Sequence, residues 1–142
     1  MSDGSGAGRP EEIELRIGAE LTNLPIIRSL AASIAMRADY DLDAIADLKL
    51  AVDEACSTLI TRASDGAGLV CVFTVAKDEI RFQVSIKSTS DAAPSSDSFG
   101  WRVLTTLTDH ADSWVERNGQ DGSRPEHLVH IALAKRRADG PA

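Results

Sequence analysis

An amphipathic segment that ends near Ile60 constrains the fold of this chain more than any other feature. Its apolar side chains recur three or four residues apart and form one stripe, made of Ile45, Leu48, Val52, Cys56 and Leu59. This spacing predicts a helix, because residues three and four positions apart lie on the same helical face. Asp41 or Asp43 can cap the helix, and acidic side chains in its first turns complement the positive end of the helix dipole. The helix therefore needs a second layer that covers its stripe.

Shorter segments before and after this helix show the periodicity of strands and helices, and the strands among them predict the layer that covers its stripe. Polar and apolar residues alternate over 12–17, as in a half-buried strand. A helix follows to about Ala35, with Asn23 as its cap and Pro25 in its first turn. Beyond Ile60 we expect strands at 69–75, 80–86, 111–117 and 128–134, and a helix at 99–109 that buries Val103, Leu104 and Leu107. The order β-α-α-β-β-α-β-β predicts an α+β sandwich, with one mixed, mostly antiparallel sheet and helices on one face.

The chain has 142 residues, a length that suits one domain with a substantial core. We expect that domain to span residues 11–135. Residues 1–10 and 136–142 are rich in Gly, Ser, Asp, Pro and charge, which is typical of disordered tails. Residues 88–98 lack any periodicity, and we expect them to form a mobile loop.

Charge and hydropathy exclude several classes of partner. The chain carries 15 Lys and Arg against 22 Asp and Glu, whereas nucleic-acid binding depends on cationic side chains that neutralise phosphates. No apolar run approaches the roughly 20 residues of a membrane span, and the N-terminus lacks an apolar signal core. Cys56 and Cys71 form neither a C-x-x-C pair nor a disulfide pattern, and Cys56 falls on the apolar stripe as a small core residue. We therefore expect a cytoplasmic protein that binds neither nucleic acid nor membranes directly.

The side of the long helix opposite its apolar stripe carries the candidate chemistry. Glu54 and Thr58 project together there, with Asp47 and Leu50 on the same side. A solvated polar face explains this pattern. A site in which the carboxylate acts as a general base and the hydroxyl as a weak metal ligand explains it too. Leu50 favours the second interpretation, because an apolar side chain indicates that something covers this side.

The run Asp47–Thr58, DLKLAVDEACST, resembles the N-box of RsbW-type anti-sigma factors, which are bacterial Bergerat-fold (GHKL) proteins that double as serine kinases. The strand at 13–17, the helix at 24–35 and the run 98–109 match that family in order and spacing. The resemblance thus covers nearly the whole domain, and it implies a two-layer sandwich of the Bergerat type.

The resemblance implies an ATP site that this chain keeps only in part. Glu54 falls on the general base, and Thr58 replaces the asparagine that binds Mg²⁺. Ser98 and Gly100 fall on the phosphate-binding turn, which lacks one of its two glycines, and residues 86–90 lack the carboxylate that binds adenine. Each lost hydrogen bond to a charged group costs roughly 1.5–3 kcal/mol. We therefore expect ATP and Mg²⁺ to bind weakly or not at all.

The resemblance also implies the partners. Arg28 aligns with a first-helix arginine on the surface shared by sigma factor and anti-anti-sigma factor, although a solvated helix arginine explains it equally well. The preferred hypothesis is an anti-sigma factor that sequesters an alternative sigma factor of the stress or sporulation type and is displaced by a STAS-type anti-anti-sigma protein. The alternative is an active serine kinase that phosphorylates the anti-anti-sigma protein with ATP. The family further implies a homodimer packed through the first strand and first helix.

The remaining polar residues predict no further site. His127 and His130 lie three apart on an expected strand, so their side chains face opposite sides and do not share a metal ion. Serine, histidine and aspartate residues are present, but no pattern brings a catalytic triad together.

Overall fold

Five strands form one sheet among residues 9–118 and 126–138, the part of the chain that this computed structural model describes. They are β1 (Glu11–Gly18), β2 (Gly68–Val75), β3 (Glu79–Ser88), β4 (His110–Glu116) and β5 (His127–Arg136). Their spatial order is β1-β2-β3-β5-β4, and all four neighbouring pairs are antiparallel. The expected α+β fold with a mostly antiparallel sheet is therefore confirmed.

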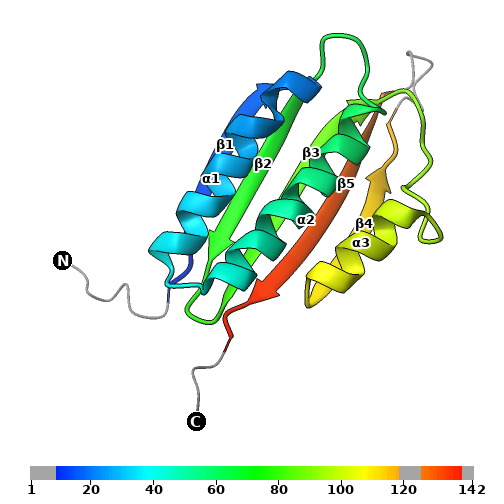
Figure 1. Cartoon of the computed structure of the whole chain (residues 1–142). Helices are drawn as coiled ribbons and strands as arrows, with labels where there is room; N and C mark the ends of the chain where they lie inside the picture. The colour runs from blue at the N-terminus through cyan, green and yellow to red at the C-terminus, as the bar shows by residue number, and fades with distance from the viewer. Residues whose placement is uncertain (1–8, 119–125, 139–142) are drawn as a thin grey trace.

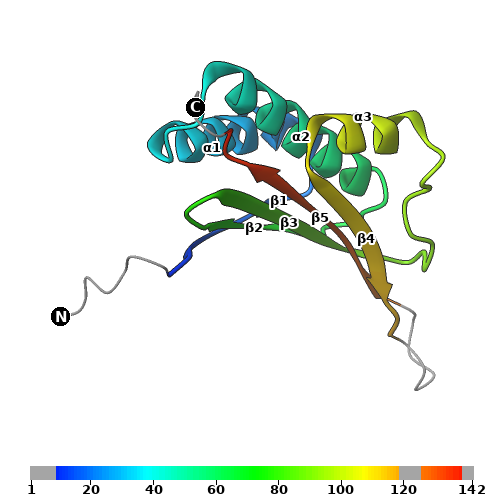
Figure 2. The same ribbon diagram turned by 90° about the horizontal axis from the view of Figure 1, so that it is seen from below.

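The helices lie on one face of this sheet, as Figure 2 shows. They are α1 (Leu24–Arg37), α2 (Leu42–Ile60) and α3 (Phe99–Leu107), with a short 3-10 turn, η2 (Leu21–Asn23), before α1. In Figure 1, α1 lies over β1 and β2, α2 runs along β3 and β5, and α3 lies beside α2 on the side of β4. The other face of the sheet carries no helix within the described residues. Of the described helices, none is long and apolar enough to cross a membrane.

The predicted apolar stripe of α2 is buried against the sheet. Its fully buried members are Leu48, Val52, Cys56 and Leu59. Ile45, at the start of the stripe, is only partly buried. The strands contribute alternate side chains to the same core, in which the rings of Phe73 and Phe82 lie 4.7 Å apart between centroids. Because each large apolar side chain gains about 1.5–3 kcal/mol on full burial, this layer holds the fold together.

Two cysteines meet inside the core, one from α2 and one from β2. Both thiols are free, and neither Cys56 nor Cys71 has any exposed surface. The hydrogen bond between them, together with burial, raises the pKa of the Cys56 thiol well above its ordinary value. Cys56 is thus a small core residue, as its place on the stripe predicts.

The structure confirms one of the predicted helix boundaries and differs from two others. Asp41 caps α2 as expected, since its Oδ1 accepts from the N–H of Ala44 at 2.8 Å. The predicted side-chain cap at Asn23 is wrong, because Asn23 already has helical backbone angles and its Nδ2 donates to the carbonyl of Gly18 at 2.8 Å. The third helix ends at Leu107 rather than near residue 109, because the next residues extend to pair with β5.

The third helix, α3, also buries fewer side chains than the sequence predicts. Of the three side chains predicted to be buried, only Leu104 is, whereas Val103 and Leu107 are partly exposed. At the end of the chain, β5 continues to Arg136, one residue past the expected boundary of the domain. Residues 1–8 and 139–142 of the expected tails lie outside the described residues.

Candidate functional site

The C-terminal half of α2 brings together the carboxylate and hydroxyl that the sequence singles out. Glu54 Oε2 accepts a hydrogen bond from Thr58 Oγ1 at 3.3 Å. The two residues are one helical turn apart, so their side chains reach each other without any distortion of the helix. The two side chains therefore lie together at one place on α2. The catalytic role of Glu54 and the metal-binding role of Thr58 stay predictions.

The first turn of α3 packs against this pair. Ser98 caps α3, because its Oγ accepts from the N–H of Trp101 at 3.1 Å. Gly100 lies so close to α2 that a side-chain carbon there would collide with the carboxylate of Glu54. The fold thus places Glu54, Thr58, Ser98 and Gly100 around one cleft, as the resemblance implies.

This cleft measures about 390 Å³ and is bounded mainly by hydroxyls and by the loop that leads from β3 to α3. Its remaining lining residues are Ser57, Thr61, Arg62, Pro94 and Ser95. Pro94 is buried there, although the residues on both sides of it in the loop are exposed. Glu54 is itself only partly buried and borders this open cleft.

The end of β3, where the resemblance places the adenine-binding carboxylate, carries a serine. Ser88 is almost fully buried, and its Oγ accepts from the N–H of Ser90 at 3.1 Å. The next carboxylate along the chain, Asp91, forms an ion pair with Arg117 at 3.3 Å. Because the end of β3 carries a serine and Asp91 is paired with Arg117, the residues present lack the free carboxylate that the resemblance assigns to adenine, and they do not fit a bound nucleotide there.

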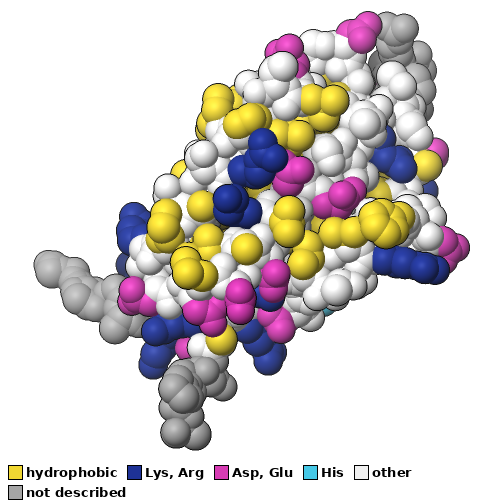
Figure 3. Space-filling model, in the orientation of Figure 1, with side chains coloured by type: hydrophobic (Ala, Val, Ile, Leu, Met, Phe, Trp, Pro, Cys, Tyr) yellow, Lys and Arg dark blue, Asp and Glu magenta, His cyan; other side chains and the backbone are white. Residues whose placement is uncertain are grey.

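Arg28 lies on the opposite side of α2 from that cleft, where α1 and α2 meet. Its Nη1 is 3.3 Å from Asp53 Oδ1, and its side chain is 41% exposed. Arg28 also borders a shallow groove with Lys49 and Met36. Figure 3 shows basic side chains in the middle of this face among hydrophobic ones. An arginine among exposed apolar side chains is typical of protein–protein surfaces.

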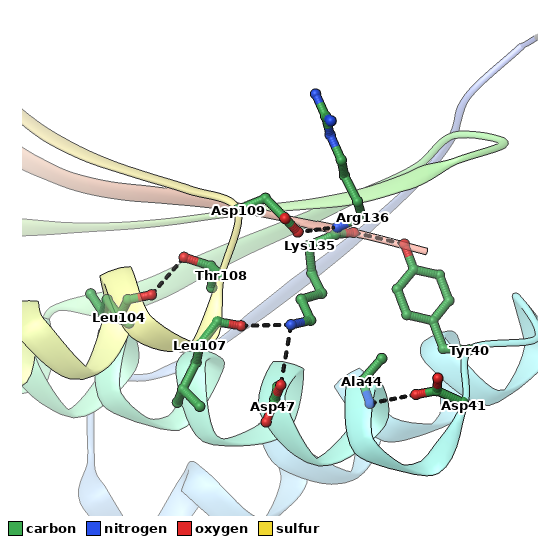
Figure 4. A network of polar contacts seen from close by, with 10 residues as sticks. All are labelled: Tyr40, Asp41, Ala44, Asp47, Leu104, Leu107, Thr108, Asp109, Lys135 and Arg136. Atoms are coloured by element: carbon green, nitrogen blue, oxygen red, sulfur yellow. Dashed lines mark hydrogen bonds and ion pairs between the residues drawn. The ribbon is translucent and has the colours of Figure 1, made fainter. Parts of the chain in front are cut away.

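The first half of α2 carries a different polar arrangement, drawn in Figure 4. Lys135 of β5 donates to Asp47 Oδ2 at 3.2 Å and to the carbonyl of Leu107 at 2.9 Å. The hydroxyl of Tyr40 donates to the carbonyl of Lys135 at 2.7 Å. Burial raises the pKa of Tyr40 to about 12. Sequence analysis assigned Asp47 to the side of Glu54 but missed its partner, because Lys135 is distant along the chain.

A second polar cluster missed by sequence analysis lies on the helix-free face of the sheet. His130 Nδ1 is 2.6 Å from Ser85 Oγ, its Nε2 is 3.0 Å from Glu116 Oε2, and its ring stacks on Trp114. The strand register explains the meeting, since His130 pairs with both Ser85 and Trp114.

His127 lies on the opposite face of β5 from His130, as the alternation of a strand predicts. Its Nδ1 accepts from the N–H of Asn118 at 3.1 Å. Among the described residues, no group of three or more His, Cys, Asp or Glu side chains is placed to hold a metal ion.

Known proteins resemble this chain along most of its length, although no model of a protein family matches it. It is 37% identical over 129 residues to the anti-sigma-F factor RsbW of Mycobacterium tuberculosis (strain ATCC 25618 / H37Rv), an alignment that spans 89% of this chain and 74% of that protein. It is 33% identical over 79 residues to the serine-protein kinase RsbW of Bacillus cereus (strain AH187), spanning 54% and 49%. The similarity to the protein named an anti-sigma factor is therefore the more extensive of the two.

Proposed function

Because this chain belongs to the RsbW family, we propose that it is an anti-sigma factor that sequesters an alternative sigma factor and is displaced by an anti-anti-sigma protein. The observation that carries this proposal is its similarity to a protein named anti-sigma-F factor over 89% of the chain. The proposal places the protein in the cytoplasm, where sigma factors act, and assigns the binding function to one domain of residues 11–135.

The face formed by α1 and α2 is the surface we assign to the partners. Arg28 and Lys49 supply cationic groups there, and Met36 and Leu50 supply exposed apolar surface on the same two helices. A planar guanidinium binds carboxylates through two donors, which suits Arg28 to an acidic side chain of the partner. The mechanism is steric: a sigma factor held on this face cannot use the covered surface to bind RNA polymerase.

Partner exchange follows if the anti-anti-sigma protein binds an overlapping part of this face. Two ligands that exclude each other shift the population of complexes according to their relative affinities, without any need for phosphate transfer. The proposal includes a homodimer packed through β1 and α1, as the resemblance implies. ATP and Mg²⁺ have at most a minor role in it, because Thr58 replaces the asparagine that the resemblance assigns to Mg²⁺ and the end of β3 carries no carboxylate for adenine.

A serine kinase that acts on the anti-anti-sigma protein is the second candidate. The placement of Glu54 beside Thr58, with the first turn of α3 against both, favours it, and the relatives in Bacillus cereus are named serine-protein kinases. In that case Glu54 would accept the proton of the attacking serine hydroxyl, while Thr58 would help hold Mg²⁺. ATP would supply the phosphoryl group.

The test is a reconstituted mixture of this chain with an alternative sigma factor of the same organism, followed by calorimetry. Arg28→Ala should weaken sigma binding by more than about 1 kcal/mol, because a central arginine is replaced. Arg81→Ala is the matched control, since Arg81 is 71% exposed on the helix-free face and pairs with Glu79. Equal affinities for all three proteins would contradict the assignment of the α1–α2 face.

The same mixture separates the two candidate functions. Glu54→Gln should leave sigma binding nearly unchanged if occlusion by the α1–α2 face is the mechanism. Transfer of phosphate from ATP to a serine of the anti-anti-sigma protein, abolished by Glu54→Gln, would establish the kinase instead.

A further inference from the structure

Arg28 and Asp53 join α1 to α2 on the face that we assign to the partners. Arg28 Nη1 lies 3.3 Å from Asp53 Oδ1. We propose that Asp53 is a positioning residue, which holds Nη1 of the guanidinium so that the opposite edge, made of Nε and Nη2, is presented to a carboxylate of the sigma factor. This inference rests on the proposed function and adds to it a residue that acts through Arg28.

The carboxylate of Asp53 is partly buried beside α1. Its side chain is 27% exposed, and its Oδ1 is buried without a hydrogen bond from any described residue. A buried carboxylate oxygen has lost the hydration that it had in the unfolded chain, and this loss is costly unless an opposite charge compensates for it. Asp53 therefore depends on the guanidinium of Arg28 for its compensation.

The packing of α1 fixes the backbone from which the Arg28 side chain extends. Ile27 precedes Arg28 and Ala31 follows one turn later, and both are fully buried. The sequence of α1, LPIIRSLAASIAMR, contains no acidic residue, so the opposite charge for Arg28 comes from another element. Because Asp53 belongs to the neighbouring packed helix, the arginine side chain is held at its backbone and at its guanidinium.

A guanidinium has two edges that can each bind a carboxylate through two hydrogen bonds. One edge consists of Nη1 and Nη2, and the other consists of Nε and Nη2. Asp53 lies at Nη1, which leaves the edge of Nε and Nη2 for a second carboxylate. The Arg28 side chain is 41% exposed, so a partner can reach it.

Small side chains leave room beside Arg28 for a carboxylate of the partner. A groove of about 450 Å³ runs along α1 past Ser29, Ala32 and Ser33, and Lys49 of α2 borders it. Arg28 and Lys49 are both cationic, whereas the whole chain has a formal net charge of −7. The charge of this groove therefore favours an acidic group of the sigma factor.

An arginine that is already held in place binds a partner at a lower entropic cost. A free side chain loses its rotamer freedom when the partner immobilises it, whereas a side chain fixed by Asp53 has lost part of that freedom beforehand. The saving corresponds to an about three- to tenfold lower dissociation constant. Removal of the Asp53 charge should reverse this saving.

The first test is calorimetry of the full chain with an alternative sigma factor of the same organism. Asp53→Asn keeps the size of the side chain and removes its charge, so sigma binding should weaken by about three- to tenfold. Asp112→Asn is the matched control, because Asp112 is exposed on the helix-free face of β4 and its loss changes the net charge equally. Its dissociation constant should stay within about twofold of the native value, since salt screens distant exposed charges.

Two variants at Arg28 isolate the pair. Arg28→Lys keeps the positive charge, but a single ammonium group cannot contact Asp53 and also offer a planar edge with two donors. This variant should weaken sigma binding by about tenfold. In an Arg28→Ala background, Asp53→Asn should have no further effect on sigma binding, because no guanidinium remains to be held.

Either of two results would overturn the proposal. Unchanged or tighter sigma binding by Asp53→Asn would mean that the carboxylate is idle or competes with the partner for Arg28. Full affinity in Arg28→Lys would mean that a point charge is sufficient. The second variant retains Asp53, so it decides the matter even if Asp53→Asn failed to fold.

A measurement without any sigma factor separates this proposal from the proposed function. NMR relaxation reports the order parameter of the Nε–H bond of Arg28, which should fall below about 0.6, the flexible range, in Asp53→Asn. An unaltered order parameter would contradict the positioning role. If the native chain bound no sigma factor but the variant lost this order, the proposed function would fail while the positioning of Arg28 by Asp53 would stand.

Discussion

The two halves of α2 carry similar acidic side chains in contrasting surroundings. In the first half, Asp47 meets Lys135, whose ammonium group also donates to the carbonyl of Leu107. In the second half, Glu54 accepts from Thr58 at 3.3 Å and borders an open cleft that the loop from β3 to α3 also lines. The charge of Asp47 is thus matched by a lysine of the sheet, whereas Glu54 borders an open cleft and, among the described residues, has only a neutral hydroxyl as its partner.

This difference shows that the fold uses the first half of α2 as a structural anchor, formed by Asp47 and Lys135, and keeps the candidate site at Glu54 in the second half. Leu107 ends α3, so Lys135 satisfies a carbonyl that the helix leaves without a partner, and it joins α2, α3 and β5 at one point. At the other end of α2, the first turn of α3 packs against Glu54. The cleft is lined by these two helices and by the loop that leads to α3.

The largest effect is expected at the anchor. Lys135→Met keeps the length of the side chain but removes two charged hydrogen bonds, so the free energy of unfolding should fall by about 2–3 kcal/mol in urea denaturation. Lys87→Met is the control, because Lys87 is 62% exposed and 3.8 Å from Glu126. Its loss should stay below about 0.5 kcal/mol. Similar losses of unfolding free energy for the two variants would contradict the structural role assigned to Lys135.

A smaller effect is expected at Tyr40. Tyr40→Phe removes the bond to the carbonyl of Lys135 and should cost about 1 kcal/mol at neutral pH. Burial raises the pKa of Tyr40 from 10.0 to about 12, so the unfolded chain loses this proton first as the pH rises. The native protein should therefore lose stability between about pH 10 and pH 12, and Tyr40→Phe should lack this part of the loss. Parallel stability curves for the two proteins across that range would contradict the assignment.

The smallest effect on stability is expected at the cleft. Gly100→Ala forces the flexible carboxylate of Glu54 aside, but alanine gains up to about 1 kcal/mol of helix propensity. The net change should stay within about 1 kcal/mol. In a Glu54→Ala background the clash is absent, so Gly100→Ala should become stabilising, which a double-mutant cycle measures. A loss above about 2 kcal/mol in the single variant would show that Glu54 is held as firmly as Asp47.

Much of the fold could be predicted from local pattern. The stripe of α2, the alternation of the strands and the cap at Asp41 each depend on residues a few positions apart, and periodicity reports such relations directly. Asn23 shows where this fails, because the 3-10 turn before α1 gives it helical angles that a capping residue does not have. The early end of α3 has a similar origin, since the pairing of Asp109 with β5 competes with the helix.

The candidate site could be predicted in part. The shared face of Glu54 and Thr58 follows from helical geometry alone, and the nearness of Ser98 and Gly100 was implied by resemblance. The burial of Pro94 and the hydrogen bond from Arg62 Nη1 to the carbonyl of Ala92 could not be predicted, because residues 88–98 show no periodicity. The cluster of Ser85, His130 and Glu116 was likewise hidden, because strand order and register decide it.

The sequence by itself determined which segments form helices and strands, which side of most of them is apolar, and that the apolar sides must meet in two layers. Only the tertiary structure decided that β5 lies between β3 and β4, which brings Lys135 under Asp47 and His130 beside Ser85. The physical reason is the separation along the chain over which each kind of interaction acts. Backbone geometry relates residues within a few positions, whereas contacts between distant residues depend on how the layers pack and on which strands become neighbours.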